Sequence, residues 1–237
     1  GKLPVSIDDE FKVNEGIETL EIKRLGFTIP ENVGMNSKVL TKIDSIANYA
    51  ISKKMTPGIQ VVVARKGKVI YQKSFGNHTY ESTQKVNNTD VYDIASLTKI
   101  VATLPNVMQE FDQGHLTLET KLKTMLPEAK NSNKANATVL DMLTHQARFQ
   151  PWIPFYKATL DSLNRPSTHY NDTIVKTILD SELLPKKQYK YSDFTFILFK
   201  EYLELHNKKS LEDLAHANFF EPLGANSIMY NPLRKMN

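Results

Sequence analysis

The chain has no cysteine among its 237 residues, so it forms no disulfide and offers no thiolate ligand to a metal. It also lacks any apolar run near the roughly 18 residues that a membrane-spanning helix needs. The first residues, GKLPVSIDDE, are not followed by the apolar segment of a signal peptide. These absences predict no membrane span, and they leave the compartment open.

Histidines and charged residues are scattered along the chain. The six histidines show no metal-ligand spacing such as His-Glu-x-x-His, and there is no glycine-rich phosphate loop. Thirty basic and 26 acidic residues give a net charge of +4, with no run of five like charges. We therefore expect no metal, no cofactor and no nucleic-acid partner.

The composition that remains, 41% hydrophobic and 24% charged, is that of a globular protein with a sizeable core. Residues 1–34 read as a tail or linker from a preceding domain, with GKLPVSI as a short edge strand that tolerates Pro4. We expect residues 35–237 to form the folded domain.

Hydrophobic periodicity predicts a mixed α+β protein, in which a β-hairpin is followed by a mainly helical region. The hairpin is expected over 59–64 and 68–75, joined at Lys66-Gly67. The aromatic stretch FQPWIPFY at 149–156 is expected to be a loop, which either packs down or lines a cleft. Helices are expected over 37–54 with Ser37 as cap, from 96 to 113 with a break at Pro105, from Thr138 to 143, from Asp172 to 184, over 194–205, and after Ser210.

The stretch VYDIASLTK carries the first chemical motif, Ser96-Leu97-Thr98-Lys99, at the start of a helical pattern. Residues three apart on a helix share a face, so the Ser96 hydroxyl and the Lys99 amine can meet. An amine acts as a base for serine only if burial or other cations lower its pKa. Ser96 and Lys99 are therefore candidates for a nucleophile and its base.

A purely structural interpretation of this motif competes with the catalytic one. Ser96 could be an ordinary N-cap beside a solvated lysine, and Ser82-Thr83-Gln84-Lys85 matches the same pattern inside a polar loop. A wide apolar stripe after Ser96 favours a buried helix that takes Lys99 inside with it. Its residues are Ile100, Val101, Leu104, Val107, Met108 and Phe111.

The second motif is Tyr191-Ser192-Asp193, which directly precedes the apolar helix expected at Phe194. A phenol near an ammonium is favoured as phenolate or passes a proton. By itself the motif is weak, because a core tyrosine with its hydroxyl satisfied is the commoner explanation and Tyr170-Asn171-Asp172 also fits.

Taken together, six ordered blocks resemble the serine β-lactamase and penicillin-binding-protein superfamily, in its class C β-lactamase, D-aminopeptidase and esterase branch. The blocks are PENVGM, GIQVVVARKGKVIYQKSFG, DIASLTK, VLDMLTH, YKYSD and FFEPLGA, within residues 30–230. The resemblance implies an antiparallel sheet flanked by helices plus a mainly helical subdomain. It also implies that Ser96 is acylated, that Lys99 activates it and that Tyr191 shuttles the proton. The Ser96 backbone N–H would supply half of the oxyanion hole.

Three departures from the family pattern stand out. Asp193 occupies a substrate-binding position where many members have asparagine, and an aspartate there would hold Lys99 charged or favour another substrate. Gln146-Ala147-Arg148 replaces a glycine-containing turn after His145, which makes His145 structural rather than catalytic. No Lys-Thr-Gly or His-x-Gly follows Tyr191, so we expect a truncated chain whose late sheet strands are missing.

The resemblance favours a serine hydrolase acting on an amide, β-lactam or ester of a small-molecule or peptide substrate. A non-catalytic peptidoglycan-binding module and an inactive fragment of an enzyme remain alternatives. The N-terminal GKLPVSI also resembles the closing strand of family 3 glycoside hydrolases, which implies a fused domain upstream and a periplasmic or extracytoplasmic location.

Overall fold

The computed structural model describes residues 6, 12–13, 25–159 and 170–232, and the expected N-terminal edge strand falls almost wholly outside them. Contacts within the chain divide it into unit 1, Gly1–Tyr92, and unit 2, Asp93–Asn237. The boundary that the sequence suggests near residue 34 stays a prediction.

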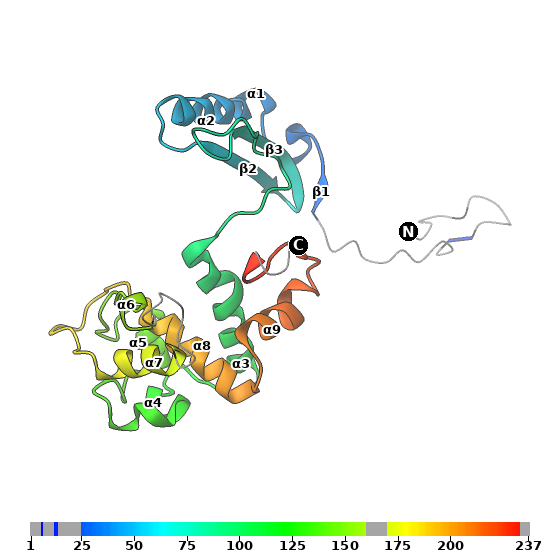
Figure 1. Ribbon diagram of the computed structural model, residues 1–237. Coiled ribbons are helices and arrows are strands. Elements are labelled where there is room, and N and C mark those ends of the chain that lie inside the picture. Colours follow the sequence, from blue (N-terminus) through cyan, green and yellow to red (C-terminus); the bar gives the residue numbers. More distant parts are fainter. Residues whose placement is uncertain (1–5, 7–11, 14–24, 160–169, 233–237) are drawn as a thin grey trace. The chain divides into compact units, whose positions relative to one another are not determined.

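Unit 1 is a three-stranded sheet with helices on it (Figure 1). Strands β2 (Gly58–Arg65) and β3 (Lys68–Gly76) form the predicted hairpin, paired from Gly58↔Gly76 to Arg65↔Lys68. Positive φ angles at Lys66 and Gly67 give the mirror-image turn that matches strand twist. The short β1 (Gly26–Phe27), which periodicity did not predict, adds to β3 in parallel.

The helices of unit 1 cover the sheet through a small apolar core. Helices α1 (Ser37–Leu40) and α2 (Lys42–Ser52) follow the 3-10 turn η1 (Pro30–Val33). The core groups Val33, Leu40 and Ile70. The predicted cap at Ser37 is wrong, because the Asn36 side chain accepts from the N–H groups of residues 38 and 39. The single predicted helix over 37–54 is also broken, at Thr41.

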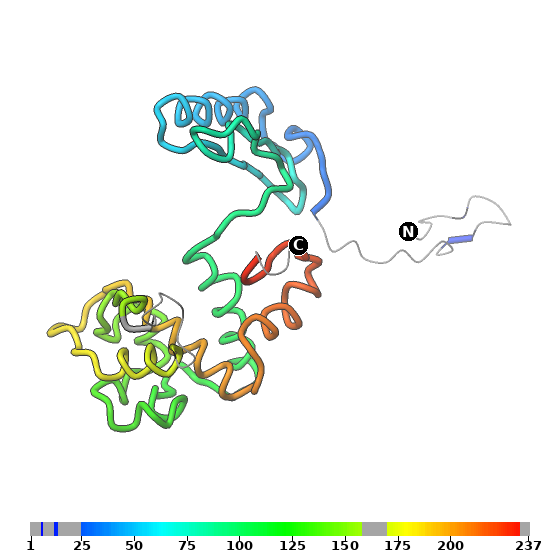
Figure 2. Tube along the Cα trace, viewed as in Figure 1, coloured from blue at the N-terminus to red at the C-terminus, as the bar shows by residue number. Residues whose placement is uncertain are grey.

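Unit 2 is mainly helical, as predicted, and its path can be followed along the tube in Figure 2. It begins with the 3-10 turn η2 (Ala95–Leu97), the π-turn η3 (Lys99–Thr103) and α3 (Leu104–Asp112). The remaining elements are α4 (Leu122–Met125), η4 (Pro127–Asn131), α5 (Val139–Leu143), α6 (Tyr156–Thr159), α7 (Tyr170–Asp180), α8 (Phe194–Asn207), α9 (Leu211–Ala215) and η5 (His216–Phe220).

Helix α8 is the central element of unit 2. Its residues Phe194, Leu198, Phe199 and Leu203 have no exposed surface, and they pack among α3, α5 and α7. Burying an apolar side chain of this size contributes about 1.5–3 kcal/mol, so α8 anchors the unit. The segment just before α8, which carries Tyr191, is therefore tied to a rigid element.

Local sequence signals set several boundaries in unit 2, and tertiary packing moved others. Thr138 caps α5 and Ser210 caps α9, as predicted. Pro105 marks the change from η3 to α3, where a missing N–H is tolerated. The prediction for α7 is wrong at both ends, because Asp172 lies inside its first turn and the helix stops at Asp180.

Candidate active site

The hydroxyl of Ser96 accepts hydrogen bonds from two side chains of unit 2. Lys99 Nζ lies 2.9 Å from Ser96 Oγ, and the Tyr191 hydroxyl lies 3.2 Å from the same oxygen. Lys99 Nζ also lies 5.5 Å from the centre of the Tyr191 ring. The structure thus brings together an alcohol, an amine and a phenol that are 95 residues apart at the extremes.

The turn before α3 presents Ser96 to solvent. Ala95 adopts φ +43°, a left-handed conformation that is costly for a residue with a Cβ. The Asp93 carboxylate accepts the Ala95 N–H at 2.7 Å and holds this turn. Ser96 then lies in η2 and Lys99 opens η3, so the two side chains project to the same side.

Asp193 is the fourth residue of the site and forms an ion pair with Lys99, in which Oδ1 lies 2.8 Å from Nζ. Burial by itself lowers the pKa of Lys99. The hydrogen bonds to Asp193 and Tyr191, with the charges of both, raise this pKa by more than burial lowers it, so it ends above its usual value. A lysine that acts as a base needs a lowered pKa, and Lys99 does not meet this requirement in the resting arrangement, where it is a cation. The expectation that an aspartate at 193 holds Lys99 charged agrees with this direction.

Hydrogen bonds to two backbone carbonyls fix the Tyr191 segment against the aromatic loop. The Ser192 hydroxyl donates to the Gln150 carbonyl at 2.6 Å, and the Asp193 N–H donates to the Pro151 carbonyl at 2.9 Å. Phe149 is buried in the core, whereas Trp152 and Tyr156 of the same stretch are exposed, so the loop packs down only in part. Packing of 149–155 thereby positions both Tyr191 and Asp193.

His145 lies in the site, although the sequence offered it only a structural role. Its Nδ1 accepts the Ser192 N–H at 3.3 Å, its carbonyl accepts the Lys190 N–H at 2.8 Å, and its ring centre lies 4.7 Å from that of Tyr191. Burial, followed by the Lys99 charge, lowers the pKa of His145, which favours the neutral imidazole. This ring orients the Tyr191 segment, and the spacing of the LTH and YSD blocks gave no hint of the contact.

The apolar stripe after Ser96 is only partly buried, which corrects the expectation of a fully buried helix. Val107 is in the core, whereas Ile100, Met108 and Phe111 remain exposed. Lys99 nevertheless keeps only 17% of its side chain accessible, because Asp193 and Tyr191 cover it. Ser82, the other serine with the Ser-x-x-Lys spacing, lies in unit 1, and its hydroxyl accepts a hydrogen bond from the Gln84 N–H.

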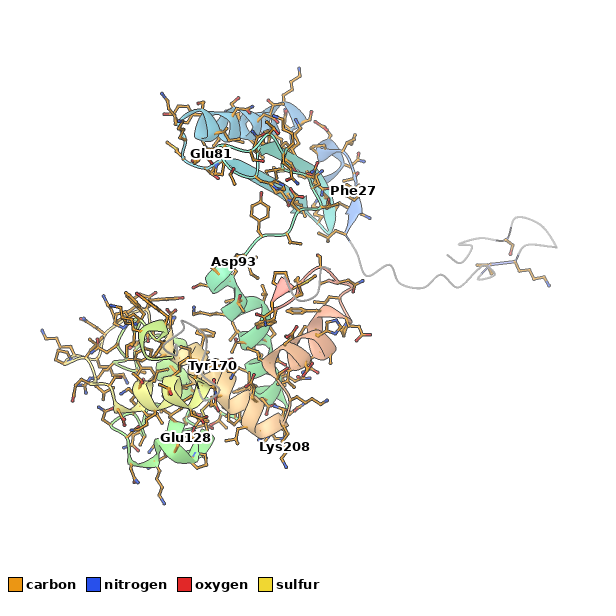
Figure 3. All side chains as sticks on the ribbon, viewed as in Figure 1. Phe27, Glu81, Asp93, Glu128, Tyr170 and Lys208 are labelled. Atoms are coloured by element: carbon orange, nitrogen blue, oxygen red, sulfur yellow. The ribbon has the colours of Figure 1, made fainter. Side chains whose placement is uncertain are left out.

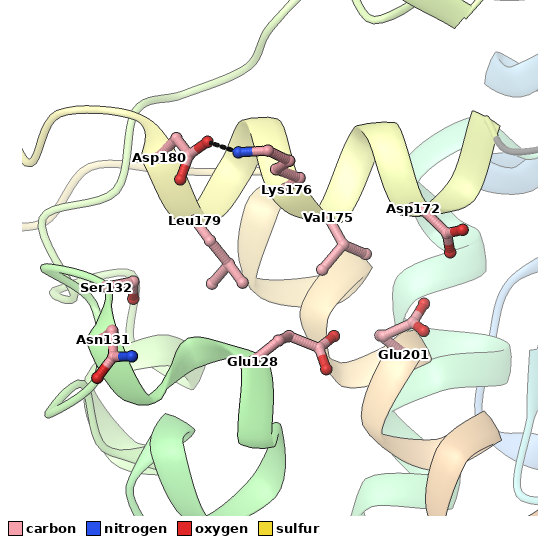
Figure 4. Close-up of a pocket in the computed structure, with 9 residues that line it drawn as sticks. All are labelled: Glu128, Asn131, Ser132, Asp172, Val175, Lys176, Leu179, Asp180 and Glu201. Carbon is pink, nitrogen blue, oxygen red and sulfur yellow. Dashed lines mark hydrogen bonds and ion pairs between the residues drawn. The ribbon is translucent and has the colours of Figure 1, made fainter.

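A cavity of about 520 Å³ opens elsewhere in unit 2, beneath α7 (Figure 4). Four of its nine lining residues are acidic, and its one lysine, Lys176, is paired with Asp180 at 2.5 Å. None of the four residues of the Ser96 site lines this cavity; they are Ser96, Lys99, Tyr191 and Asp193. The carboxylates around it are Glu128, Asp172, Asp180 and Glu201.

Comparison with known proteins gives a consistent result. The family model described as Beta-lactamase matches residues 47–236. An N-acetylmuramyl-L-alanine amidase of Bacillus subtilis is 26% identical over 223 residues, covering 86% of this chain and 49% of that protein. A putative D-alanyl-D-alanine carboxypeptidase of Salmonella gallinarum is 22% identical, covering 91% of this chain and 53% of that protein. The chain thus spans about half the length of these curated relatives.

Solved structures share the fold. The octameric penicillin-binding protein homologue from Pyrococcus abyssi superposes with a TM-score of 0.68 at 21% identity, over 84% of this chain and 46% of that one. A class C beta lactamase from Rhodobacter sphaeroides gives a TM-score of 0.61 at 21% identity, over 78% and 49%. The α+β fold class expected from the sequence is confirmed. Within the described residues, no helix is both long and apolar enough to cross a membrane.

Proposed function

The chain belongs to the beta-lactamase family, and we propose that it is a serine hydrolase that works through an acyl-enzyme on Ser96. The observation that carries the proposal is the pair of contacts to one oxygen, 2.9 Å from Lys99 Nζ and 3.2 Å from the Tyr191 hydroxyl. Nucleophile and base within hydrogen-bond reach are the signature of covalent catalysis.

The proposed first half-reaction begins when Lys99 or Tyr191 loses a proton to solvent water. The Ser96 proton then passes to that pair, and Oγ forms a bond to the substrate carbonyl carbon. The Ser96 backbone N–H is the donor we assign to the resulting oxyanion. The bond to the leaving group breaks as that group takes a proton from Tyr191, and the acyl group stays on Ser96 as an ester.

In the second half-reaction, water attacks the ester as the same pair takes its proton, and the acid product leaves as Ser96 regains its hydrogen. Lys99 forms a hydrogen bond with Tyr191 and an ion pair with Asp193, so the proton on Lys99 depends on both neighbours. We therefore assign base catalysis to the pair rather than to one residue.

The proposed substrate is an amide, ester or β-lactam of the cell-wall peptide kind. Support comes from the names of two relatives, an N-acetylmuramyl-L-alanine amidase and a putative D-alanyl-D-alanine carboxypeptidase. Such substrates lie outside the cytoplasmic membrane, so we also propose an extracytoplasmic location, which fractionation of cells with a specific antibody tests.

One observation favours a second candidate, a binding module without turnover. The ion pair of 2.8 Å between Lys99 and Asp193 stabilises the cation, which binds a carboxylate but removes no proton. This candidate predicts saturable binding of wall peptides with no hydrolysis of nitrocefin or p-nitrophenyl esters by the full-length protein.

Covalent labelling separates the two candidates. The full-length protein is treated with a fluorophosphonate or a labelled penicillin, and the modified residue is located by mass spectrometry. We expect label on Ser96 and none in Ser96→Ala. Ser82→Ala is the matched control, because Ser82 has the same Ser-x-x-Lys spacing but lies in unit 1, and it should label like wild type. Label retained in Ser96→Ala would refute the assignment.

A further inference from the structure

Two histidines and a glutamate meet at the far end of α3 from Ser96. Glu110 lies in the last turns of α3, His115 follows the turn at Gly114, and His206 lies near the C-terminal end of α8. Figure 3 labels Lys208, the residue that follows α8. One ligand atom from each of the three lies within 4.8 Å of the others.

The contacts converge on one oxygen of a buried carboxylate. Glu110 keeps 5% of its side chain accessible, and its Oε2 lies 2.8 Å from His115 Nδ1 and 3.4 Å from His206 Nε2. The two imidazole ring centres are 4.8 Å apart. Each ring is more than 40% exposed, so an ion can reach the nitrogens from solvent.

A second set of groups holds this trio in place. Asn207 Nδ2 donates to the other oxygen, Oε1 of Glu110, at 2.9 Å, and the Tyr202 hydroxyl approaches Oε2 at 3.5 Å. The Tyr202 ring stacks on His206 at 5.4 Å, which fixes the imidazole. Ligating carboxylates and imidazoles in metal sites have such outer partners.

We propose that Glu110, His115 and His206 form a binding site for a divalent transition metal, with zinc as the best fit. Two imidazole nitrogens and one carboxylate oxygen are a borderline-soft donor set that suits zinc. Bond lengths of about 2.1 Å place tetrahedral ligands roughly 3.4 Å apart. Small side-chain rotations that separate the Glu110 and His115 atoms, now 2.8 Å apart, and bring the rest of the trio within that distance would fit an ion. Water takes the fourth position.

The site is separate from the proposed catalytic centre. Glu110 lies 14 positions after Ser96 along a mostly helical segment, which is about 20 Å at 1.5 Å per residue. The ion would join the C-terminal ends of α3 and α8, the two helices that start directly after the catalytic segments. Its role is therefore to stabilise the scaffold, because an ion that binds only the folded state shifts unfolding by mass action.

Metal titration tests this proposal independently of hydrolase activity. The full-length protein is stripped with EDTA and titrated with Zn²⁺ by calorimetry at pH 7.5, and with Co²⁺ by visible absorption. We expect a zinc site that raises Tm and that weakens about 100-fold or more in His115→Ala and in His206→Ala.

His216→Ala is the matched control, because His216 is an exposed unit 2 histidine that lies 3.8 Å from the Glu221 carboxylate and outside the trio. It should bind Zn²⁺ like wild type. Both test variants change half-exposed side chains, and circular dichroism confirms that they fold. Zinc affinity unchanged in His115→Ala and His206→Ala, or no measurable binding by wild type, would overturn the site.

Discussion

Replacing Tyr191 by phenylalanine removes one oxygen from the Ser96 site and leaves the ring in place. The hydroxyl lies 3.2 Å from Ser96 Oγ, whereas the ring keeps its contact with His145 at 4.7 Å and its position beside Lys99 Nζ. The variant therefore isolates what the phenol does from what the aromatic ring does.

Two roles for the Tyr191 hydroxyl differ in magnitude. If it only orients Ser96, its loss costs one hydrogen bond of about 0.5–1.5 kcal/mol, at the weak end because Tyr191 is 41% exposed. That cost corresponds to about tenfold or less in rate. If it passes a proton, the loss is that of a general acid–base group, about 10²–10⁴-fold or roughly 3–5 kcal/mol. The two ranges do not overlap, so the assay can tell the two roles apart.

The assay compares kcat/KM for a p-nitrophenyl ester and for an amide or alkyl ester with the same acyl group. A poor leaving group needs its proton more, so we expect Tyr191→Phe to lose activity more on the amide or alkyl ester. Tyr189→Phe is the control, since this tyrosine lies two residues away, is 69% exposed and also contacts the His145 ring. A loss below tenfold on both substrates, matching Tyr189→Phe, would refute the shuttle.

Three further changes test the site and the scaffold. Asp193→Asn removes the charge that raises the pKa of Lys99, so the neutral amine forms at lower pH and the acid limb of the pH–rate profile shifts downward. Leu198→Ala empties a fully buried position of α8 and should cost about 2–5 kcal/mol in urea unfolding, against under about 0.5 for the half-exposed Leu205→Ala. Gly76→Ala places a side chain on a residue with φ +72° and brings its Cβ to 2.2 Å from a backbone oxygen, so the free energy of unfolding of unit 1 should fall by about 1–3 kcal/mol.

Each of these has an outcome that contradicts it. An acid limb that stays in place in Asp193→Asn means that the ion pair does not set the charge of Lys99. Equal unfolding free energies for the two leucine variants would remove α8 from the core. If circular dichroism shows that unit 1 of Gly76→Ala melts as in wild type, the turn tolerates a side chain.

Local signals accounted for much of the fold because their causes are local. The hairpin at 58–76 follows from β-branched strands and a turn with two positive φ angles, and Thr138 and Ser210 cap helices through their own backbone. The errors have tertiary causes. The strand β1 exists only through β3, and the exposed face of α3 could not be told from a buried one by periodicity.

The order of residues along the chain determined the family likeness, the α+β class and the candidates Ser96, Lys99, Tyr191 and Asp193, since each depends on short spacings and local chemistry. Tertiary packing alone decided which charges and rings face one another. It placed Asp193 on Lys99 and raised the pKa of that amine, and it gathered Glu110, His115 and His206 from separate segments. No spacing rule reveals such groupings, because they arise where α8 and the loops beside it pack against the α3 segment.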